Sequence, residues 1–484
     1  MRLLDIRPGL YRDSVRLMQI STTLGQLPGV SKVLVAMATG ANLELLAGMG
    51  FGDGVEASPD DLLIAVVADD DETTAATLER LERELAEPGV AVGPVDATQP
   101  RSRTSSAALK NLGDPSVVVV STPGRYAFVE AMDALDAGAS VLVFSDNVPV
   151  AEEIALKRAA ADRGLLVMGP DCGTAVVSGV GLGFANVVRP GPVGLVAASG
   201  TGAQQVMSLL AWAGVGVSHC LGVGGRDLTD RVGGLSTHAA LDLLDADAAT
   251  ELIVLVAKPA DAGVAAEVRA HLDRLGTAVV SAVLGPDQPD LTAAVERVLE
   301  RLGQPLPAWP HWPSSTGPGA PYGFLRGLYS GGTLCAEALT IASEAFGPVA
   351  SNLNPQWTNG GHSLLDLGAD EFTAGRPHPM IDPGPRLDRF AAEAADPSCG
   401  VLLLDVVLGH AAHPDPATDL APAIRSARMV RPELTVAISL VGTADDPQRL
   451  TDQAERLAAA GADVFGSNAQ AARFAVAAAQ ENPA

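Results

Sequence analysis

Short runs of β-branched and other apolar residues alternate along the chain with Ala- and Leu-rich stretches whose apolar positions recur at helical spacing. Such alternation is typical of parallel sheets wrapped by helices. The turn-rich stretch 93–104 is expected to be a linker that closes the first set of elements, residues 1–100. Within that set the pattern predicts helices at 13–24, 41–49 and 72–86 and strands at 30–37 and 62–67.

The same alternation of strands and helices continues through the rest of the chain. It predicts a Rossmann-like unit at 113–190 and two flavodoxin-like units at 191–304 and 324–484. The Pro- and Gly-rich segment 305–323 lies between the last two and is expected to be a linker. The predicted fold is therefore α/β, with several doubly wound parallel-sheet domains and a small N-terminal α/β unit at 1–100.

Composition narrows the classes of function. With 484 residues, 47% of them hydrophobic and 18% charged, the chain can bury large cores and is not globally disordered. A formal net charge of −25 makes nucleic acid and anionic membranes poor partners. The four cysteines show no CxxC pair, and no apolar run approaches the ~18 residues of a spanning helix. With a charged N-terminus unlike a signal peptide, the chain is predicted to be cytoplasmic.

One sequence event occurs twice: a strand ends, a loop of small residues follows, and a helix begins. Glycines let the backbone approach a ligand, hydroxyls cap the helix, and the first-turn N–H groups with the helix dipole favour an anion. A plain capped helix would need the same residues, but their recurrence in two similar units favours phosphate or carboxylate binding. The predicted anion-binding residues are Ser199, Gly200, Thr201 and Gly202 in the first loop and Ser330, Gly331, Gly332 and Thr333 in the second.

Three segments follow one another as in the α subunit of succinyl-CoA synthetase, which they resemble: MGPDCGT at 168–174, PGPVGLVAASGT at 190–201 and LGVGGRDL at 221–228. Residues 117–174 look like the CoA-binding domain of that subunit, and 325–484 resemble the C-terminal ligase domain of its β subunit. With the motif DEFTAGRPHPMIDP at 370–383, nearly the whole chain resembles the FdrA-type acyl-CoA-synthetase-like proteins.

The resemblance implies an activity, although two features of succinyl-CoA synthetase are missing. That enzyme passes phosphate through a histidine late in the α ligase domain, and the corresponding stretch 282–288 has none. The ATP-grasp half of the β subunit is also absent from the sequence. FdrA-type proteins are linked to the oxamate carbamoyltransferase of allantoin catabolism, which converts oxalurate and phosphate to oxamate and carbamoyl phosphate. The resemblance therefore implies a carbamoyltransferase subunit without a phosphohistidine, working with co-encoded partner subunits.

Two alternatives stay open. One is an acyl-CoA ligase component that uses CoA and a separate ATP-grasp partner, and the other is a non-catalytic regulatory protein. The expected ligand is a small anion, either phosphate or a carboxylate such as oxalurate or oxamate. CoA is a further candidate ligand, and no other cofactor is predicted. A homo-oligomer is a candidate assembly beside the partner subunits.

Candidate catalytic side chains crowd the loops of the last unit: His362, Arg376, His378, His410 and His413. An arginine grips a phosphate or carboxylate with two parallel hydrogen bonds, and a histidine can move the proton of a leaving group. The same histidines would also serve as ordinary loop and capping hydrogen-bond partners. His410 and His413 have metal-like spacing, but without the Glu of H-E-x-x-H no metal site is predicted.

A turn in the Rossmann-like unit is where the resemblance places CoA. Ser121, Pro123 and Arg125 follow a predicted strand, and Arg125 is the nearest positive charge in the sequence. Asp171 of the MGPDCGT segment joins them in the resemblance. The turn is either a remnant of CoA binding or a working site, and the sequence favours neither.

Overall fold

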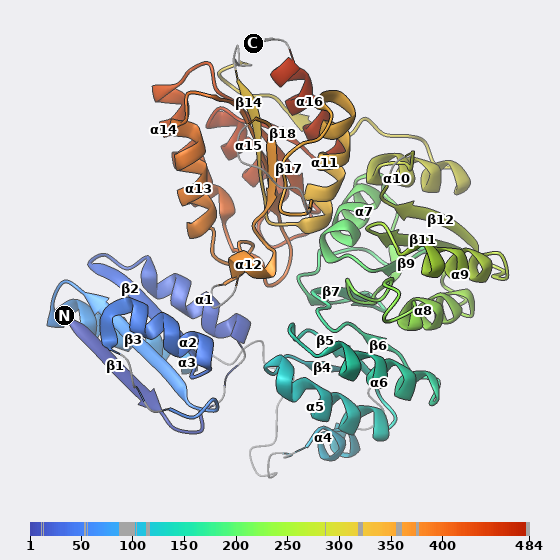
Figure 1. Cartoon of the computed structure of the whole chain (residues 1–484), viewed down its shortest axis with the longest axis horizontal. Coiled ribbons are helices and arrows are strands. Elements are labelled where there is room, and N and C mark those ends of the chain that lie inside the picture. The colour runs from blue at the N-terminus through green and yellow to red at the C-terminus, as the bar shows by residue number, and fades with distance from the viewer. Residues whose placement is uncertain are drawn as a thin grey trace. The chain divides into compact units, whose positions relative to one another are not determined.

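A computed structural model describes residues 1–10, 12, 14–52, 55, 57–86, 102, 104–112, 117–285, 287–317, 323–354, 361–373 and 377–480. The chain forms two compact units (Figure 1): unit 1 comprises Met1–Arg103 and Asp370–Asp382, and unit 2 comprises Thr104–Ala369 and Pro383–Ala484. Among the described helices, none is both long and apolar enough to cross a membrane.

Unit 1 is built on an antiparallel three-stranded sheet of order β1-β3-β2. The expected helices and strands are present, but the expectation of parallel strands is wrong here, because β1 and β2 both run opposite to β3. The sequence pattern misses β1, since Arg2, Asp5 and Arg7 interrupt its apolar positions. The elements are β1 Arg2–Arg7, α1 Ser14–Gly25, β2 Val30–Met37, α2 Gly40–Leu46, a π-helical turn Ala47–Phe51, β3 Leu62–Ala68 and α3 Asp71–Ala86.

Unit 2 begins with a small parallel sheet of order β4-β5-β6, flanked by helices. Its valines and leucines pack against the alanine-rich faces of α5 and α6 in one buried cluster. This is the part predicted to be Rossmann-like. Its elements are α4 Ser105–Leu112, β4 Val117–Val120, α5 Gly124–Asp136, β5 Ser140–Val143, α6 Val150–Ala161 and β6 Val167–Met168.

The next sheet has the order β12-β11-β9-β10-β7-β8. Strands β9 to β12 are parallel, and their order β10-β9-β11-β12 is the flavodoxin-like winding that the sequence predicts. An antiparallel hairpin, β7 with β8, extends the sheet and was not predicted. The elements are β7 Thr174–Val177, β8 Val180–Gly183, β9 Val193–Ala197, α7 Gly200–Trp212, β10 Val217–Gly222, α8 Leu235–Asp245, β11 Leu252–Ala257, α9 Ala262–Leu272, β12 Ala278–Val283 and α10 Leu291–Arg301.

The last sheet has the order β13-β18-β17-β16-β14-β15, again with flavodoxin-like winding of its parallel strands. Strand β13 lies inside the segment predicted to be a linker and pairs antiparallel with β18. The elements are β13 His311–Trp312, β14 Phe324–Tyr329, α11 Gly332–Phe346, β15 Ser363–Asp366, α13 Gly384–Ala395, β16 Cys399–Val407, α14 Pro416–Val430, β17 Thr435–Val441, α15 Leu450–Ala459, β18 Asp463–Phe465 and α16 Asn468–Gln480.

The segment Asp370–Asp382 belongs to unit 1, although in sequence it lies between β15 and α13 of unit 2. It begins with the short helix α12 (Asp370–Thr373), and its Met380 and Ile381 are buried. Most of the described part of the DEFTAGRPHPMIDP motif therefore belongs to the N-terminal unit, although its neighbours in sequence belong to unit 2. The stretch predicted as a linker at 93–104 falls almost entirely outside the described residues.

A buried ion cluster joins the Rossmann-like part to the first flavodoxin-like part. The ammonium of Lys157 on α6 is fully buried, 2.8 Å from Glu153 Oε1 and 2.7 Å from Asp227 Oδ1. Asp227 also accepts hydrogen bonds from the backbone N–H groups of Ser236 and Thr237 in the first turn of α8. The LGVGGRDL segment, which contains Asp227, therefore contributes to packing between two parts of unit 2.

Replacement of Lys157 by Met should lower the free energy of unfolding by about 3–5 kcal/mol. The buried carboxylate of Asp227 loses its ammonium partner, and Glu153 keeps only Arg226, at 2.9 Å. Urea unfolding measures the loss. The matched control is Arg163→Met, which removes an exposed pair with Asp136 (2.6 Å) and should cost less than about 1 kcal/mol. Equal losses in the two variants would contradict this role of the buried cluster.

Candidate functional site

The N-termini of α7 and α11 meet inside unit 2. Ser199 Oγ, the N-cap of α7, donates a hydrogen bond of 2.6 Å to Thr333 Oγ1 in the first turn of α11. A Cβ on Gly331 would lie 2.8 Å from Thr201 Oγ1, closer than real side chains approach. Glycine at this position therefore lets the two loops touch, and the two predicted anion loops lie at one place.

The winding of the two sheets explains why the loops meet there. Ser199 follows β9 and Ser330 follows β14, each the first parallel strand of its flavodoxin-like sheet. In each sheet this first strand lies between the second and the third parallel strands of the chain. The third strand, β11 in one sheet and β16 in the other, pairs with β9 and β14 respectively. This is the point where strand order reverses, and open α/β sheets bind ligands just outside it.

An internal carboxylate already occupies part of the second loop. Buried Asp405 of β16 accepts hydrogen bonds from the N–H of Ser330 (2.8 Å), from its hydroxyl (2.7 Å) and from the N–H of Gly331 (2.7 Å). Arg386 of α13 lies 2.9 Å from the same carboxylate. Ser330 and Gly331 therefore do not fit their predicted role as donors to an external anion, because their polar hydrogens are engaged.

Four other backbone donors belong to the two helix starts. The N–H of Gly202 is used by Ser199 Oγ (3.0 Å). In the described part of the chain, the N–H groups of Gly200, Thr201, Gly332 and Thr333 have no hydrogen-bond acceptor. Helix starts leave such N–H groups for capping groups, water or ligands.

The sequence reasoning missed Lys258. This exposed residue follows β11 directly, and its Nζ lies 3.0 Å from the position that a Cβ on Gly332 would take. Asp366 Oδ2, at the end of β15, lies 2.5 Å from the same position. A usable signal was present: β11 borders the reversal of strand order, and Lys258 is the first residue after it.

The predicted catalytic residue His362 does not lie at these loops. His362 precedes β15 instead of following a strand, so it lies at the amino end of the sheet, opposite to the loops. Its Nδ1 accepts from the N–H of Leu325 (3.0 Å), and its ring stacks on Phe346 at 3.8 Å. Burial, and then the charge of Arg326, lower the pKa of His362. These contacts are those of a packing residue.

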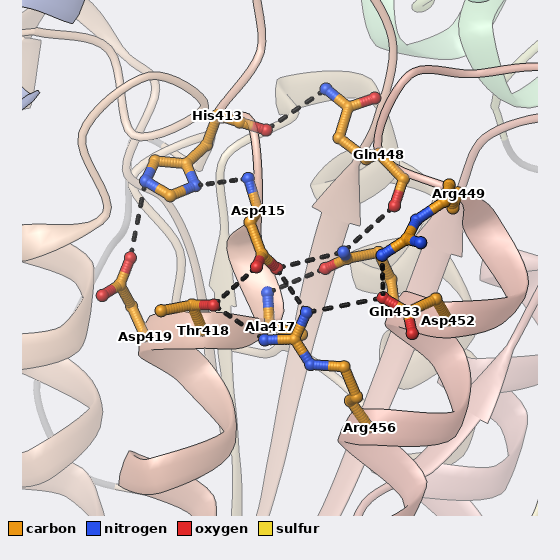
Figure 2. A network of polar contacts seen from close by, with 10 residues as sticks. All are labelled: His413, Asp415, Ala417, Thr418, Asp419, Gln448, Arg449, Asp452, Gln453 and Arg456. Atoms are coloured by element: carbon orange, nitrogen blue, oxygen red, sulfur yellow. Dashed lines mark hydrogen bonds and ion pairs between the residues drawn. The ribbon is translucent and has the colours of Figure 1, made fainter.

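His413 is held within a polar network after β16 (Figure 2). Its Nδ1 accepts from the N–H of Asp415 (3.2 Å), and its Nε2 lies 3.4 Å from Asp419 Oδ2. Both ring nitrogens are therefore engaged. Asp415 in turn binds Arg456 (2.7 Å), so that the network ties the start of α14 to α15.

The two remaining candidates that the structure describes lie in different surroundings. His410 is exposed, and its backbone N–H donates to the carbonyl of Ala185 at 2.8 Å. His378 belongs to unit 1, where its Nδ1 accepts from the N–H of Met380 (3.2 Å). Arg376 lies outside the described residues.

The turn proposed for CoA is assembled from the ends of all three strands of its sheet. Ser121 and Pro123 follow β4, and Pro123 is the N-cap of α5. The N–H of Asp171 donates to the carbonyl of Ser145 (3.0 Å), whose hydroxyl reaches back to the first turn. The guanidinium of Arg125, which lies outside this turn, stands over the ring of Tyr126 at 4.8 Å.

Comparison with known proteins supplies the family. Residues 328–478 match the CoA-ligase family, and residues 1–99 match the heavy metal-associated domain of AllF. The chain is 36% identical, over 503 aligned positions and 96% of both chains, to the uncharacterized protein YahF of Escherichia coli. The chain belongs to the YahF family of acyl-CoA-synthetase-like proteins.

More distant relatives of this YahF-family chain are ligase subunits. It is 31% identical over 147 residues to the succinate–CoA ligase subunit alpha 2 of Archaeoglobus fulgidus, covering 30% of the chain and 50% of that protein. It thus spans about half the length of that subunit. The ATP citrate lyase of Methanothrix soehngenii, solved with citrate and coenzyme A, matches 42% of the chain and 38% of its own at 19% identity, with a TM-score of 0.34. So low a score carries no functional argument.

The name of the N-terminal family domain implies a metal, and the residues of the chain do not fit one. Soft metal ions in such sites are held by cysteine thiolates or histidine nitrogens. Residues 1–99 contain neither cysteine nor histidine. In the described part of the whole chain, no three His, Cys, Asp or Glu residues group as metal ligands.

Buried Glu337 on α11 ties the candidate site to two other helices. Its Oε1 accepts from the N–H of Leu291 (2.6 Å) at the start of α10, and its Oε2 accepts from Asn468 Nδ2 (2.7 Å) at the start of α16. Burial, assisted by the charge of Asp290, raises the pKa of Glu337 from its usual 4.5 to about 7. The folded state therefore favours the protonated form more than the unfolded chain does.

This shift predicts a pH dependence of stability. Because the pKa is higher in the folded state, the contribution of Glu337 is fully present below about pH 4.5 and is lost as pH rises to about 7, a change of about 3 kcal/mol. Glu337→Gln should remove this component, as measured by urea unfolding across that pH range. Glu344→Gln, an exposed glutamate of the same helix, should leave it intact. An unchanged pH profile in Glu337→Gln would contradict the assignment.

Proposed function

We propose that this chain is the acyl-transfer subunit of an enzyme that moves a carbamoyl or acyl group between its carrier and phosphate. The phosphate would lie between the first turns of α7 and α11. The observation that most supports this is the hydrogen bond from Ser199 to Thr333, because it brings two helix N-termini and their open N–H groups to one place.

The chemistry needs no histidine relay. A phosphate oxygen attacks the ureido carbon of a substrate such as oxalurate, a C–O bond forms, and the C–N bond to oxamate breaks while the departing nitrogen takes a proton. The N–H groups of Gly200, Thr201, Gly332 and Thr333 are placed to bind phosphate oxygens, and preorganised donors of this kind stabilise developing charge. His410, which is exposed, stays a proposal for the proton transfer, and Arg376 stays a proposal for holding the carboxylate.

The absence of a histidine from the stretch after β12 supports direct use of phosphate. Residues 282–288 contain none. The nearest in sequence, His271 on α9, is paired with Asp242 at 2.7 Å and with Arg274 at 3.0 Å. Such contacts suit a surface ion pair better than a mobile phosphate carrier.

A second candidate is an acyl-CoA ligase component that borrows an ATP-grasp partner. The similarity to succinate–CoA ligase α subunits supports it, as does the match of residues 328–478 to the CoA-ligase family. In that case CoA would bind at Ser121, Pro123, Arg125 and Asp171. Partner subunits are expected in both cases.

Reconstitution of the chain with its co-encoded partner subunits separates the two candidates. Carbamoyl phosphate from oxalurate and phosphate, without ATP, is expected for the first. Acyl-CoA formation that requires ATP and CoA is expected for the second. Failure of every subunit combination to form either product would overturn the proposed enzyme activity.

In the active complex, Ser199→Ala should lower kcat/KM for phosphate by about 100-fold, because the helix start loses its cap and its contact with Thr333. The matched control is Thr39→Ala, which removes the N-cap of α2 in unit 1 and should change kcat/KM less than about twofold. Steady-state kinetics at several phosphate concentrations measures both. Equal effects would mean that the Ser199 variant acts only through helix stability.

A further inference from the structure

We infer that Lys258 sets the charge preference of the anion site and selects a dianionic phosphoryl group over a singly charged carboxylate. The inference rests on the proposed function. Lys258 enters from the first flavodoxin-like sheet, and its Nζ stands over Gly332 at the start of α11, which belongs to the second. Lys258 therefore adds a positive charge, from the end of β11, to the N–H donors at the starts of α7 and α11.

Lys258 is available for a ligand. Within the described residues its ammonium makes no hydrogen bond or ion pair, and its side chain is exposed. The neighbouring cation, Arg386, is instead buried and committed to Asp405 at 2.9 Å. Unlike Arg386, Lys258 can therefore take a ligand without breaking a buried pair.

A count of local charges shows what Lys258 contributes. Three charged residues, Asp366, Asp405 and Lys258, contribute to the electrostatic potential in the first turn of α11, since each acts on Cys335 there. Asp405 is offset by Arg386, and the two helix N-termini supply about +0.5 each. Lys258 adds a full positive charge to the half charges of the two helix N-termini, which together amount to about +1. The electrostatic potential at these helix starts therefore depends strongly on this lysine.

This count separates two classes of ligand. In a given potential, the Coulomb energy of a dianion is twice that of a monoanion. Loss of Lys258 should therefore weaken a phosphate dianion by the square of the factor by which it weakens a carboxylate. The backbone N–H groups remain when Lys258 is lost, so their hydrogen bonds to either ligand are retained.

Calorimetric titration of the full chain at about pH 8, where inorganic phosphate is mainly a dianion, tests the inference without any activity assay. In Lys258→Met the affinity for phosphate should fall about 25-fold, and that for oxamate only about 5-fold. Lys258→Arg, which keeps the charge, should retain phosphate binding within about 5-fold. Lys110→Met, at an exposed lysine of α4, should change neither affinity.

The outcomes distinguish the inference from the proposed function. If wild-type protein binds phosphate and Lys258→Met binds it equally well, the inference is overturned while the site at α7 and α11 stands. Equal weakening of phosphate and oxamate, or equal losses in the Met and Arg variants, would also overturn it. Wild-type protein that binds neither ion would overturn both proposals together.

Discussion

Two helices that point their N-termini at one place bring like ends of their dipoles together, and the fold must offset that repulsion. Each end behaves as about half a positive charge. Asp405 offsets part of it, since its buried carboxylate binds the loop that precedes α11. Arg386 then neutralises Asp405, so that the two helix ends again attract negative charge. An anion bound by the N–H groups of the two helix starts would complete the balance.

The same place depends on contacts made far along the chain. Asn186, which follows the β7–β8 hairpin, donates to the carbonyl of Leu408 (3.0 Å) and to Asp446 (2.8 Å), and so fixes the loop after β16. Gln205 of α7 donates to the carbonyl of Gly466 (3.0 Å). These hydrogen bonds fix the two flavodoxin-like parts relative to each other. The N–H groups at the starts of α7 and α11 can bind one anion only if both helices are fixed in this way.

Much of the fold and part of the site follow from the sequence, for identifiable reasons. The loop at Ser199 was predictable because a strand, a hydroxyl cap and glycines stand in order. Asp405 was hidden, since a carboxylate inside a run of apolar residues gives no local signal of which loop it binds. Lys258 was missed because its proximity to Gly332 appears only once the two flavodoxin-like parts are packed together. His362 was predicted to be catalytic because the sequence around a loop histidine does not show at which end of the sheet it lies.

Two charged residues beside the start of α11 flank the segment that belongs to unit 1. The segment Asp370–Asp382 is held in unit 1, yet Asp366 stands four residues before it and Arg386 four residues after it. Both flanking residues contribute charge at the start of α11, one beside Lys258 and the other on Asp405. The net charge of −25 acts differently, since salt screens exposed charges beyond about 10 Å. Local groups, Asp366 and Arg386 among them, would therefore decide the affinity of the proposed site for an anion.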